Sequence, residues 1–352
     1  MIKCLPITVN PHITSECWTY YKFAILQSQK YYWKWLCNNM GLFVDYNGNA
    51  FYGEKGNKYP LSYFDTVLNF STAKFSKISS EKIVDFIIRS INNGKYVILD
   101  VNINKINNSN KKDFKLHETL IYGYDTKEKC FYSPILFEKF KVVKIDFETL
   151  ISAYDDARMF YLSNKNKIFE RITWFNGITL VKPISNYRPS NLEYDFYCRL
   201  KRESQGRVCS FGNSFENINA TQHIEGLLKY TVIENRLDKV IKGELNKNSL
   251  FGNLHACSLK IYEVHNMMSF VFEKFLIKYK HDTSLNTEYE RYKLCCHEMK
   301  KIILLIEKFY YTHNEELIIK IRNGFSTLYD IEKDIYEKYA NRLRELYTKR
   351  II

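Results

Sequence analysis

Glycine and proline are scarce in this chain, at 13 and 6 of its 352 residues, and long apolar runs are missing. This composition excludes a collagen-like chain, and a hydrophobic content of 45% excludes a disordered one. The longest apolar runs, such as residues 301–307, fall far short of the ~18 residues that a membrane span needs. The sequence therefore predicts a globular protein with no membrane partner.

Familiar catalytic signatures are also missing. The chain has no G-x-G-x-x-G, no Walker lysine loop, no H-E-x-x-H, no G-x-S-x-G and no paired C-x-x-C. The common nucleotide-binding, zinc and serine-hydrolase classes are thereby excluded. Cysteine, histidine and acidic residues are left to carry any chemistry, and we expect no cofactor.

The chain start and the cysteine count favour a cytoplasmic protein. Residues 1–10 contain no apolar segment after a basic start, so no signal peptide is recognised. The nine cysteines are odd in number and lack the spacing of a disulfide framework, which favours reduced thiols.

The net charge of +13 is spread along the chain rather than gathered in blocks. Lys, Asn, Ile and Tyr are abundant together, as an AT-rich coding sequence produces by itself, and the basic residues are dispersed among acidic ones. We therefore expect no nucleic-acid partner. A modest attraction to an acidic protein is left open.

The pattern divides near residue 185 into a mixed α+β half and a helical half. Before it, short β-rich runs are separated by turn residues, which predicts a mostly antiparallel sheet, and helices are expected to open at Ser15 and to cover about residues 80–92. The expected strands cover residues 95–103, 118–125, 130–132, 141–145, 159–162 and 177–183. We predict domains at 1–185 and 186–352, with a linker at 186–190.

Helical periodicity dominates the second half and predicts an all-α bundle that acts as a lid, a partner surface or a homodimer contact. The breaks between helices are expected at residues 246–253, 284–286 and 313–314. The apolar positions of the two main stripes are Leu254, Cys257, Ile261, Val264, Met268, Val271 and Phe275, and then Ile321, Phe325, Leu328, Ile335, Tyr339, Leu343 and Leu346.

Potential metal ligands occur in the helical half, at His255, Cys257, His265, Cys295 and His297. Helical neighbours two residues apart point to different faces, and Cys257 belongs to the apolar stripe. Small buried thiols are therefore the preferred interpretation, and no metal is expected.

Cys17 is the candidate nucleophile. Ser15 is a plausible N-cap and Glu16 a first-turn acid, so Cys17 would begin a helix, where converging backbone N–H groups favour the thiolate. His117 lies a hundred residues later at the head of an expected strand. A cysteine at a helix start facing a histidine on a sheet is an arrangement that activates a thiol.

These residues resemble a known family. Cys17 at a helix start, HETLIYGYD over residues 117–125, CFYSP over 130–134 and FETLISAY over 147–154 are similar to the N-terminal domain family of butirosin biosynthesis protein H. More distantly they resemble the bacteriocin-leader-processing branch of papain-like cysteine peptidases. The similarity covers about residues 10–185, and it is looser in the helical tail.

The resemblance implies a papain-like N-terminal domain with Cys17 as nucleophile and His117 as base. It implies transfer of an acyl or peptidyl group from a carrier-protein thioester to a small amine, in the biosynthesis of antibiotics and other specialised, nonribosomal-type metabolites. The alternatives are a cysteine peptidase or thioesterase that uses water, and an inactive protein that binds a carrier or a peptide. The residues Arg199, Lys201, Arg202 and Arg207 are read first as a solvated polar face, and a basic dock for the carrier is the alternative.

The chain departs from the family at the residue that orients the histidine. An Asp or Asn is usual after the Gly-Tyr-Asp strand, whereas this chain offers Ser133, with Asp125 and Glu138 as alternatives. Asp125 is expected to serve the turn that follows it. Asn10 is the sole amide side chain upstream of Cys17 for the oxyanion, and the Cys17 backbone N–H is a second donor. A weakened or lost triad is left open.

Overall fold

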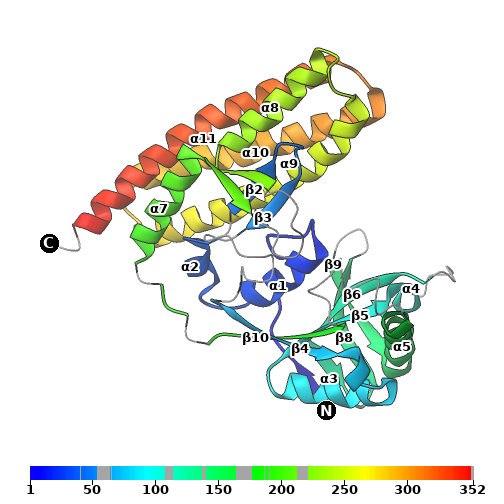
Figure 1. Cartoon of the computed structure of the whole chain (residues 1–352). Helices are drawn as coiled ribbons and strands as arrows, with labels where there is room; N and C mark the ends of the chain where they lie inside the picture. Colours follow the sequence, from blue (N-terminus) through cyan, green and yellow to red (C-terminus); the bar gives the residue numbers. More distant parts are fainter. Residues whose placement is uncertain are drawn as a thin grey trace. The chain divides into compact units, whose positions relative to one another are not determined.

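The computed structural model describes residues 1–39, 41–53, 64, 66–107, 114–136, 140–163, 177–185, 187–189, 191–211 and 221–349. It forms two compact units (Figure 1). The first comprises Met1–Lys30 and Phe64–Tyr187, and the second comprises Tyr31–Tyr63 and Arg188–Ile352. The chain enters the second unit a second time within the predicted linker and stays there to its end. Residues 187–189 of this linker have neither helix nor strand.

The first unit mixes helices with two four-stranded sheets, ordered β1-β7-β8-β9 and β4-β10-β5-β6. Its elements are β1 (Ile2–Cys4), α1 (Cys17–Gln27), β4 (Leu68–Lys74), η2 (Phe75–Lys77), η3 (Ser80–Lys82), α3 (Ile83–Asn92), β5 (Tyr96–Asn102), α4 (Ile103–Ile106), β6 (Leu116–Ile121), β7 (Gly123–Asp125), β8 (Cys130–Leu136), β9 (Phe140–Asp146), α5 (Phe147–Ser163) and β10 (Gly177–Pro183).

The predicted antiparallel pairing is confirmed for every described pair of strands in this unit. One sheet was expected, and there are two. The two sheets share one nearly continuous segment, because β6 and β7 are separated only by Tyr122, whose backbone N–H donates to the Tyr132 carbonyl at 3.2 Å. This segment carries the predicted base, His117, at its beginning.

The core of the first unit lies between β5 and the helices α3 and α5. Ile83, Ile87 and Ile91 recur every fourth residue and are fully buried, as their spacing predicts. Both faces of β5 are buried, which explains its nearly unbroken apolar run. The polar exceptions in β5, Asp100 and Asn102, therefore have to find partners inside the protein.

The strand predicted at residues 159–162 is wrong, because these residues complete α5. A short apolar run fits either a strand or the end of a helix. The helical stripe decides the outcome, since it continues through the run to Tyr161, which is buried beside Phe75. The buried positions of α5 are Leu150, Ala153, Tyr154, Ala157 and Tyr161.

The second unit joins a four-stranded antiparallel sheet, ordered β11-β12-β2-β3, to long helices. Its elements are α2 (Tyr32–Leu36), β2 (Gly41–Asp45), β3 (Ala50–Gly53), α7 (Leu192–Gln205), β11 (Arg207–Phe211), β12 (Thr221–Glu225), α8 (Leu228–Ile241), α9 (Lys247–Lys278), α10 (Thr283–Thr312) and α11 (Glu316–Thr348).

The expectation that residues 186–352 are entirely helical is therefore wrong before residue 228, although the described residues after it contain helices and no strand. The sheet escaped prediction because β12 pairs with β2, which lies about 180 residues earlier in the chain. Figure 1 shows α9, α10 and α11 running side by side as the yellow, orange and red helices.

Helix stripes were predicted better than helix ends. All the stripe positions named for α9 and α11 are buried except Leu346, which is partly exposed. The break at His313 is confirmed, and this residue ends α10 with a left-handed φ of 51°. The other two breaks are displaced, since residues 247–253 already belong to α9 and residues 284–286 to α10.

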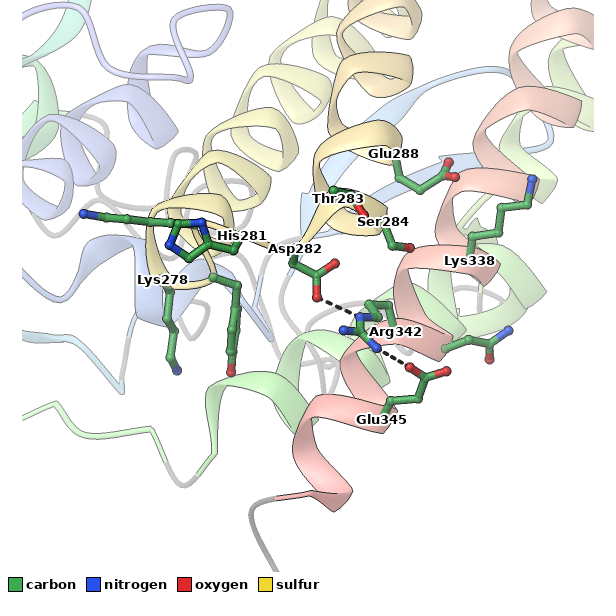
Figure 2. A pocket seen from close by; sticks show the side chains of 12 residues that line it. Lys278, His281, Asp282, Thr283, Ser284, Glu288, Lys338, Arg342 and Glu345 are labelled. Atoms are coloured by element: carbon green, nitrogen blue, oxygen red, sulfur yellow. Dashed lines mark hydrogen bonds and ion pairs between the residues drawn. The ribbon is translucent and has the colours of Figure 1, made fainter.

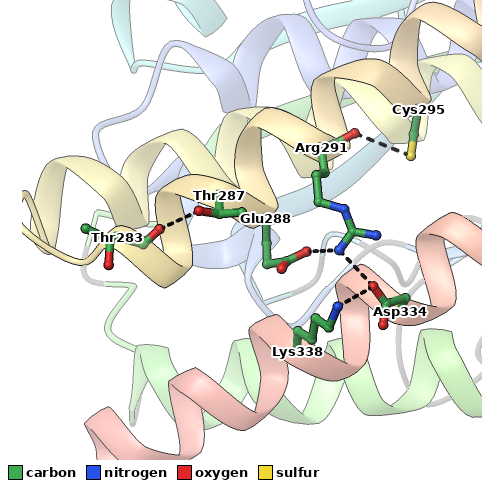
Figure 3. A network of polar contacts seen from close by, with 7 residues as sticks. All are labelled: Thr283, Thr287, Glu288, Arg291, Cys295, Asp334 and Lys338. Carbon is green, nitrogen blue, oxygen red and sulfur yellow. Dashed lines mark hydrogen bonds and ion pairs between the residues drawn. The ribbon is translucent and has the colours of Figure 1, made fainter.

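A polar network fastens α10 to α11 (Figure 3). The Arg291 guanidinium bridges Glu288 at 2.6 Å and Asp334 at 2.7 Å, and Lys338 pairs with Asp334 at 2.7 Å. The Cys295 thiol donates to the Arg291 carbonyl at 3.7 Å, so it is engaged within its own helix. None of the described helices is long and apolar enough to cross a membrane.

Candidate functional site

Cys17 is the first residue of α1, as predicted. The N-cap is Glu16 and not Ser15, because the backbone is extended at Glu16 (φ −141°, ψ 111°) and the first helical bond runs from the Tyr20 N–H to the Glu16 carbonyl. The Glu16 carboxylate accepts a hydrogen bond from the Thr19 hydroxyl at 2.9 Å. The thiol is therefore placed at a helix start beside an acid.

The electrostatics of Cys17 differ from the expectation for a helix start. Burial raises the pKa of the thiol, the charge of Glu118 raises it further, the Cys17 backbone N–H lowers it, Glu16 raises it and Lys115 lowers it. The resting group is thus a neutral thiol rather than a thiolate. A nucleophilic step at Cys17 would need a base at the moment of attack.

Helix α1 is fastened to strand β6 one turn beyond the thiol. The Tyr21 hydroxyl donates to the Glu118 carbonyl at 2.8 Å. Residues four apart lie on the same face of a helix, so Cys17 faces β6 as Tyr21 does. The pKa of Tyr21 is raised well above its usual value by burial and then by the charges of Cys17 and Glu118, which agrees with this placement.

His117 is anchored to the same carbonyl. Its Nδ1 lies 2.7 Å from the Glu118 carbonyl oxygen, which can only accept, so Nδ1 carries the proton. The Glu118 carboxylate lies 3.7 Å from Nδ1, and the His117 side chain is 33% exposed. In the neutral ring Nε2 then has a free lone pair. One carbonyl therefore joins the face of α1 that bears Cys17 to the predicted base.

Glu118, which the sequence interpretation did not single out, is the acidic partner of His117. Successive residues on a strand point to opposite faces, which argues against a contact between neighbours. The contact forms because the imidazole bends back toward the Glu118 backbone. An acid directly after the histidine is the only sequence signal for this role.

The predicted orienting residues that the structure describes have other hydrogen-bond partners. Ser133 is buried, and its hydroxyl bonds to Thr119 at 2.8 Å. The Asp125 carboxylate accepts from the N–H groups of residues 127 and 128, so it serves the turn as expected. Glu138 lies outside the described residues. Asn10, the candidate oxyanion donor, is exposed.

The predicted basic dock in the second unit is wrong for two of its four residues. Arg199 is fully buried and donates to the Leu36 carbonyl. Arg202 is nearly buried and pairs with Glu225 at 2.8 Å, and the more exposed Arg207 pairs with the same carboxylate at 2.5 Å. Arg199 and Arg202 thus stabilise the interior of the unit, whereas Arg207 is exposed and Lys201 is partly exposed.

Two of the potential metal-ligating histidines of the second half have other partners. His265 pairs with Glu332 at 2.8 Å inside the bundle, and His255 lies 3.3 Å from Glu307. Among the described residues, no group of three or more His, Cys, Asp or Glu side chains is arranged to hold a metal ion. The cysteines whose side chains are described form no disulfide.

A pocket of about 760 Å³ opens in the second unit where α9 ends and α10 begins (Figure 2). It is lined by Lys278, Tyr279, Lys280, His281, Asp282, Thr283, Ser284, Glu288, Lys338, Asn341, Arg342 and Glu345. Arg342 pairs with Asp282 and Glu345, and Asp282 also caps α10 through the Leu285 N–H. Arg342, Asp282 and Glu345 thus satisfy one another, and none of the predicted site residues lines the pocket.

No protein family model matches the chain, and no curated protein matches it.

Proposed function

We propose that the chain is a cysteine-dependent acyltransferase that takes an acyl or peptidyl group from a carrier-protein thioester onto Cys17 and passes it to an amine. The observation that carries this proposal is the shared carbonyl of Glu118, which binds both Tyr21 of the cysteine helix and the imidazole of His117. The resemblance of residues 10–185 to the family of the butirosin enzyme supplies the substrate class. Carrier partner, acceptor and papain-like fold are part of the proposal.

The first half of the reaction acylates the thiol. Since the Cys17 pKa is raised, the proton has to leave as sulfur attacks the thioester carbonyl, and Nε2 of His117 is the group that receives it. The N–H groups at the start of α1 have no partners within the helix and are suited to the developing oxyanion. When the tetrahedral intermediate collapses, the carrier thiol leaves and takes the proton from His117.

The second half transfers the acyl group. The amine attacks the Cys17 thioester and passes one proton to His117. The C–S bond breaks, the thiol recovers its proton from the imidazolium, and the product is an amide. Glu118 stabilises the transient imidazolium, because its carboxylate lies 3.7 Å from Nδ1.

A non-covalent binding role is the second candidate, and one observation favours it. The raised pKa of Cys17 leaves little thiolate at neutral pH, in contrast to what the helix start predicts. A protein of this kind would hold the carrier or peptide without forming a bond to it.

Intact-mass measurement after incubation with an acyl-carrier thioester tests these candidates. We expect an acyl adduct that disappears in Cys17→Ala and persists in Cys4→Ala, which removes an exposed thiol of the same unit. Adding amines should convert the adduct to amide, whereas release of free acid alone would identify a hydrolase. Carrier binding without any adduct would replace the proposal by the binding role.

A further inference from the structure

Two carboxyl groups face each other beside the proposed site. Asp100 of β5 lies directly opposite Glu118 of β6 in the antiparallel register, so their side chains share one face of the sheet. Opposed residues of this kind have Cβ atoms ~4.5–5.5 Å apart. Asp100 is only 3% exposed, and the Glu118 side chain is 17% exposed. Two negative charges that are this close and this buried repel each other, so ionising both carboxyl groups costs free energy.

The groups around Asp100 supply hydrogen bonds but little positive charge. From α5, the Tyr161 hydroxyl donates to the Asp100 carboxylate at 2.6 Å. From α1, Tyr21 lies near both carboxyl groups and Cys17 lies near Glu118, and from β6 comes His117 beside Glu118. On the other side of β5 the paired residues of β10 are uncharged between Ile178 and Val181.

Nearby cations are engaged elsewhere. Lys105 pairs with Asp156 at 2.7 Å, and Asn102, the next residue on the face of Asp100, also donates to Asp156. The charge of Lys115 acts on Cys17. Within the part of the first unit that the structure describes, no lysine or arginine forms an ion pair with Asp100 or Glu118. Protonation of one of the two carboxyl groups would relieve the repulsion.

The ionisation of Asp100 reflects this environment. Burial raises the pKa of Asp100 to about 7, against the lowering effect of the Tyr161 hydrogen bond, and the charge of Glu118 contributes to the rise. Asp100 is thus close to half protonated at neutral pH.

We propose that Asp100 and Glu118, opposed on one buried face of the sheet, share a proton, and that this carboxyl pair sets the charge beside Cys17. Asp100 touches no reacting atom, so it is a positioning residue that acts through Glu118. With one proton in the pair, a single negative charge remains to stabilise the His117 imidazolium. Without that proton a second negative charge disfavours the Cys17 thiolate. The consequence for acyl transfer rests on the proposed function, whereas the shared proton does not.

Infrared spectroscopy of the full chain tests the shared proton directly. A protonated carboxyl group has its own C=O stretch, and we expect this band at pH 6 and its loss by pH 9. Asp100→Asn should remove the band. Asp125→Asn, which alters an equally buried aspartate of the same unit that serves a turn, should leave it. A wild-type protein without the band at pH 6 would overturn the proposal.

Alkylation of Cys17 by iodoacetamide tests the effect on the thiol and needs no substrate. We expect Asp100→Asn to react ~3–10-fold faster than wild type at pH 8, because one nearby negative charge is gone. Tyr161→Phe removes a hydrogen bond that favours ionised Asp100, so it should move the infrared transition to higher pH. An Asp100→Asn rate equal to wild type from pH 6 to 9 would refute the link to Cys17.

The two proposals fail in different ways. If Cys17 never carries an acyl group from a thioester, the acyltransferase is wrong, but the infrared band and the alkylation rates still report the carboxyl pair. If the acyl adduct forms and Asp100→Asn changes neither readout, the carboxyl pair is wrong and the acyltransferase stands.

Discussion

Each unit contains a histidine beside a glutamate, and the two pairs differ in burial and in the residues that surround them. His265 and Glu332 lie 2.8 Å apart, at 1% and 0% exposure, in the interior of the second unit. His117 and Glu118 lie 3.7 Å apart and are partly exposed, at 33% and 17%, in the first unit. The same two side chains thus occur once as a sealed pair and once as an open one.

The sealed pair is surrounded by groups that satisfy it. Tyr230 donates to one Glu332 oxygen at 2.6 Å and Tyr336 to the other at 3.0 Å. Burial by itself raises the pKa of Glu332, but His265, Lys229 and Tyr230 more than offset this and lower it to about 2. A buried network in which both Glu332 oxygens are hydrogen-bonded stabilises one packing arrangement of α8, α9 and α11.

The open pair has the opposite character. Its neighbour Asp100 has a raised pKa, its neighbour Cys17 has a raised pKa, and both keep a proton that they can lose near or above neutral pH. Groups with perturbed ionisation beside a nucleophile are typical of sites that move protons. The comparison therefore attributes stability to the sealed pair, whereas the open pair fits the proposed chemistry.

The largest effect should come from replacing His117, the proposed base of the open pair. His117→Gln is expected to slow the acylation of Cys17 by about 10²–10⁴-fold, the usual contribution of a positioned base, without loss of folding stability. The rate is obtained by quenching the reaction at set times and measuring the acyl adduct by intact mass. His12→Gln, a histidine of the same unit, should keep the wild-type rate. Equal rates for wild type and His117→Gln would remove His117 from the mechanism.

Breaking the sealed pair should affect stability instead. Glu332→Gln removes the buried carboxylate that binds His265, Tyr230 and Tyr336, so we expect a loss of about 3–5 kcal/mol in the free energy of unfolding, measured with urea. The matched control is Asp334→Asn on the same helix, whose half-exposed pairs with Arg291 and Lys338 should contribute only about 0–1 kcal/mol. A smaller loss for Glu332→Gln than for Asp334→Asn would contradict the comparison.

The two buried carboxyl groups should also give opposite pH dependences. The pKa of Glu332 is lowered in the folded state, so its stabilisation is present above the unfolded value of 4.5 and is lost as the pH falls through about 2, on the order of 2–3 kcal/mol. The pKa of Asp100 is raised, so its contribution is present below the unfolded value of 3.8 and is lost as the pH rises through about 7.

Urea unfolding of the variants between pH 2 and 8 separates these contributions. Glu332→Gln should flatten the acid limb, and Asp100→Asn should flatten the decline between pH 4 and pH 7. If both variants change the same limb, the two carboxyl groups do not differ as described.

Sequence patterns predicted what depends on local periodicity. The stripes of α3, α9 and α11 repeat every three or four residues, and their buried faces follow directly. The start of α1 at Cys17 was also recognisable from its acidic neighbour and the helix that follows.

Long-range pairing was not predictable in the same way. Strand β2 lies in the first half of the sequence, yet it pairs with β12 across about 180 residues, and no local pattern near either strand indicates that partner.

The partner of His117 was missed because it depends on a side-chain conformation that the sequence does not show. Strand alternation turns the Glu118 side chain away, and the contact exists only because the imidazole bends toward the backbone.

The smallest expected effect distinguishes Glu118 from Ser133, the orienting residue that the sequence suggested. The Nδ1 atom of His117 is already held by a backbone carbonyl, so Glu118→Gln removes only a partly exposed charge, and the acylation rate should fall roughly two- to fivefold. Ser133→Ala breaks a buried bond to Thr119, which should lower stability by about 1 kcal/mol and leave the rate unchanged. A hydroxyl that bonds only to Thr119 should not affect the imidazole. A larger loss of rate in Ser133→Ala than in Glu118→Gln would therefore show that Ser133 orients His117, as the sequence suggested.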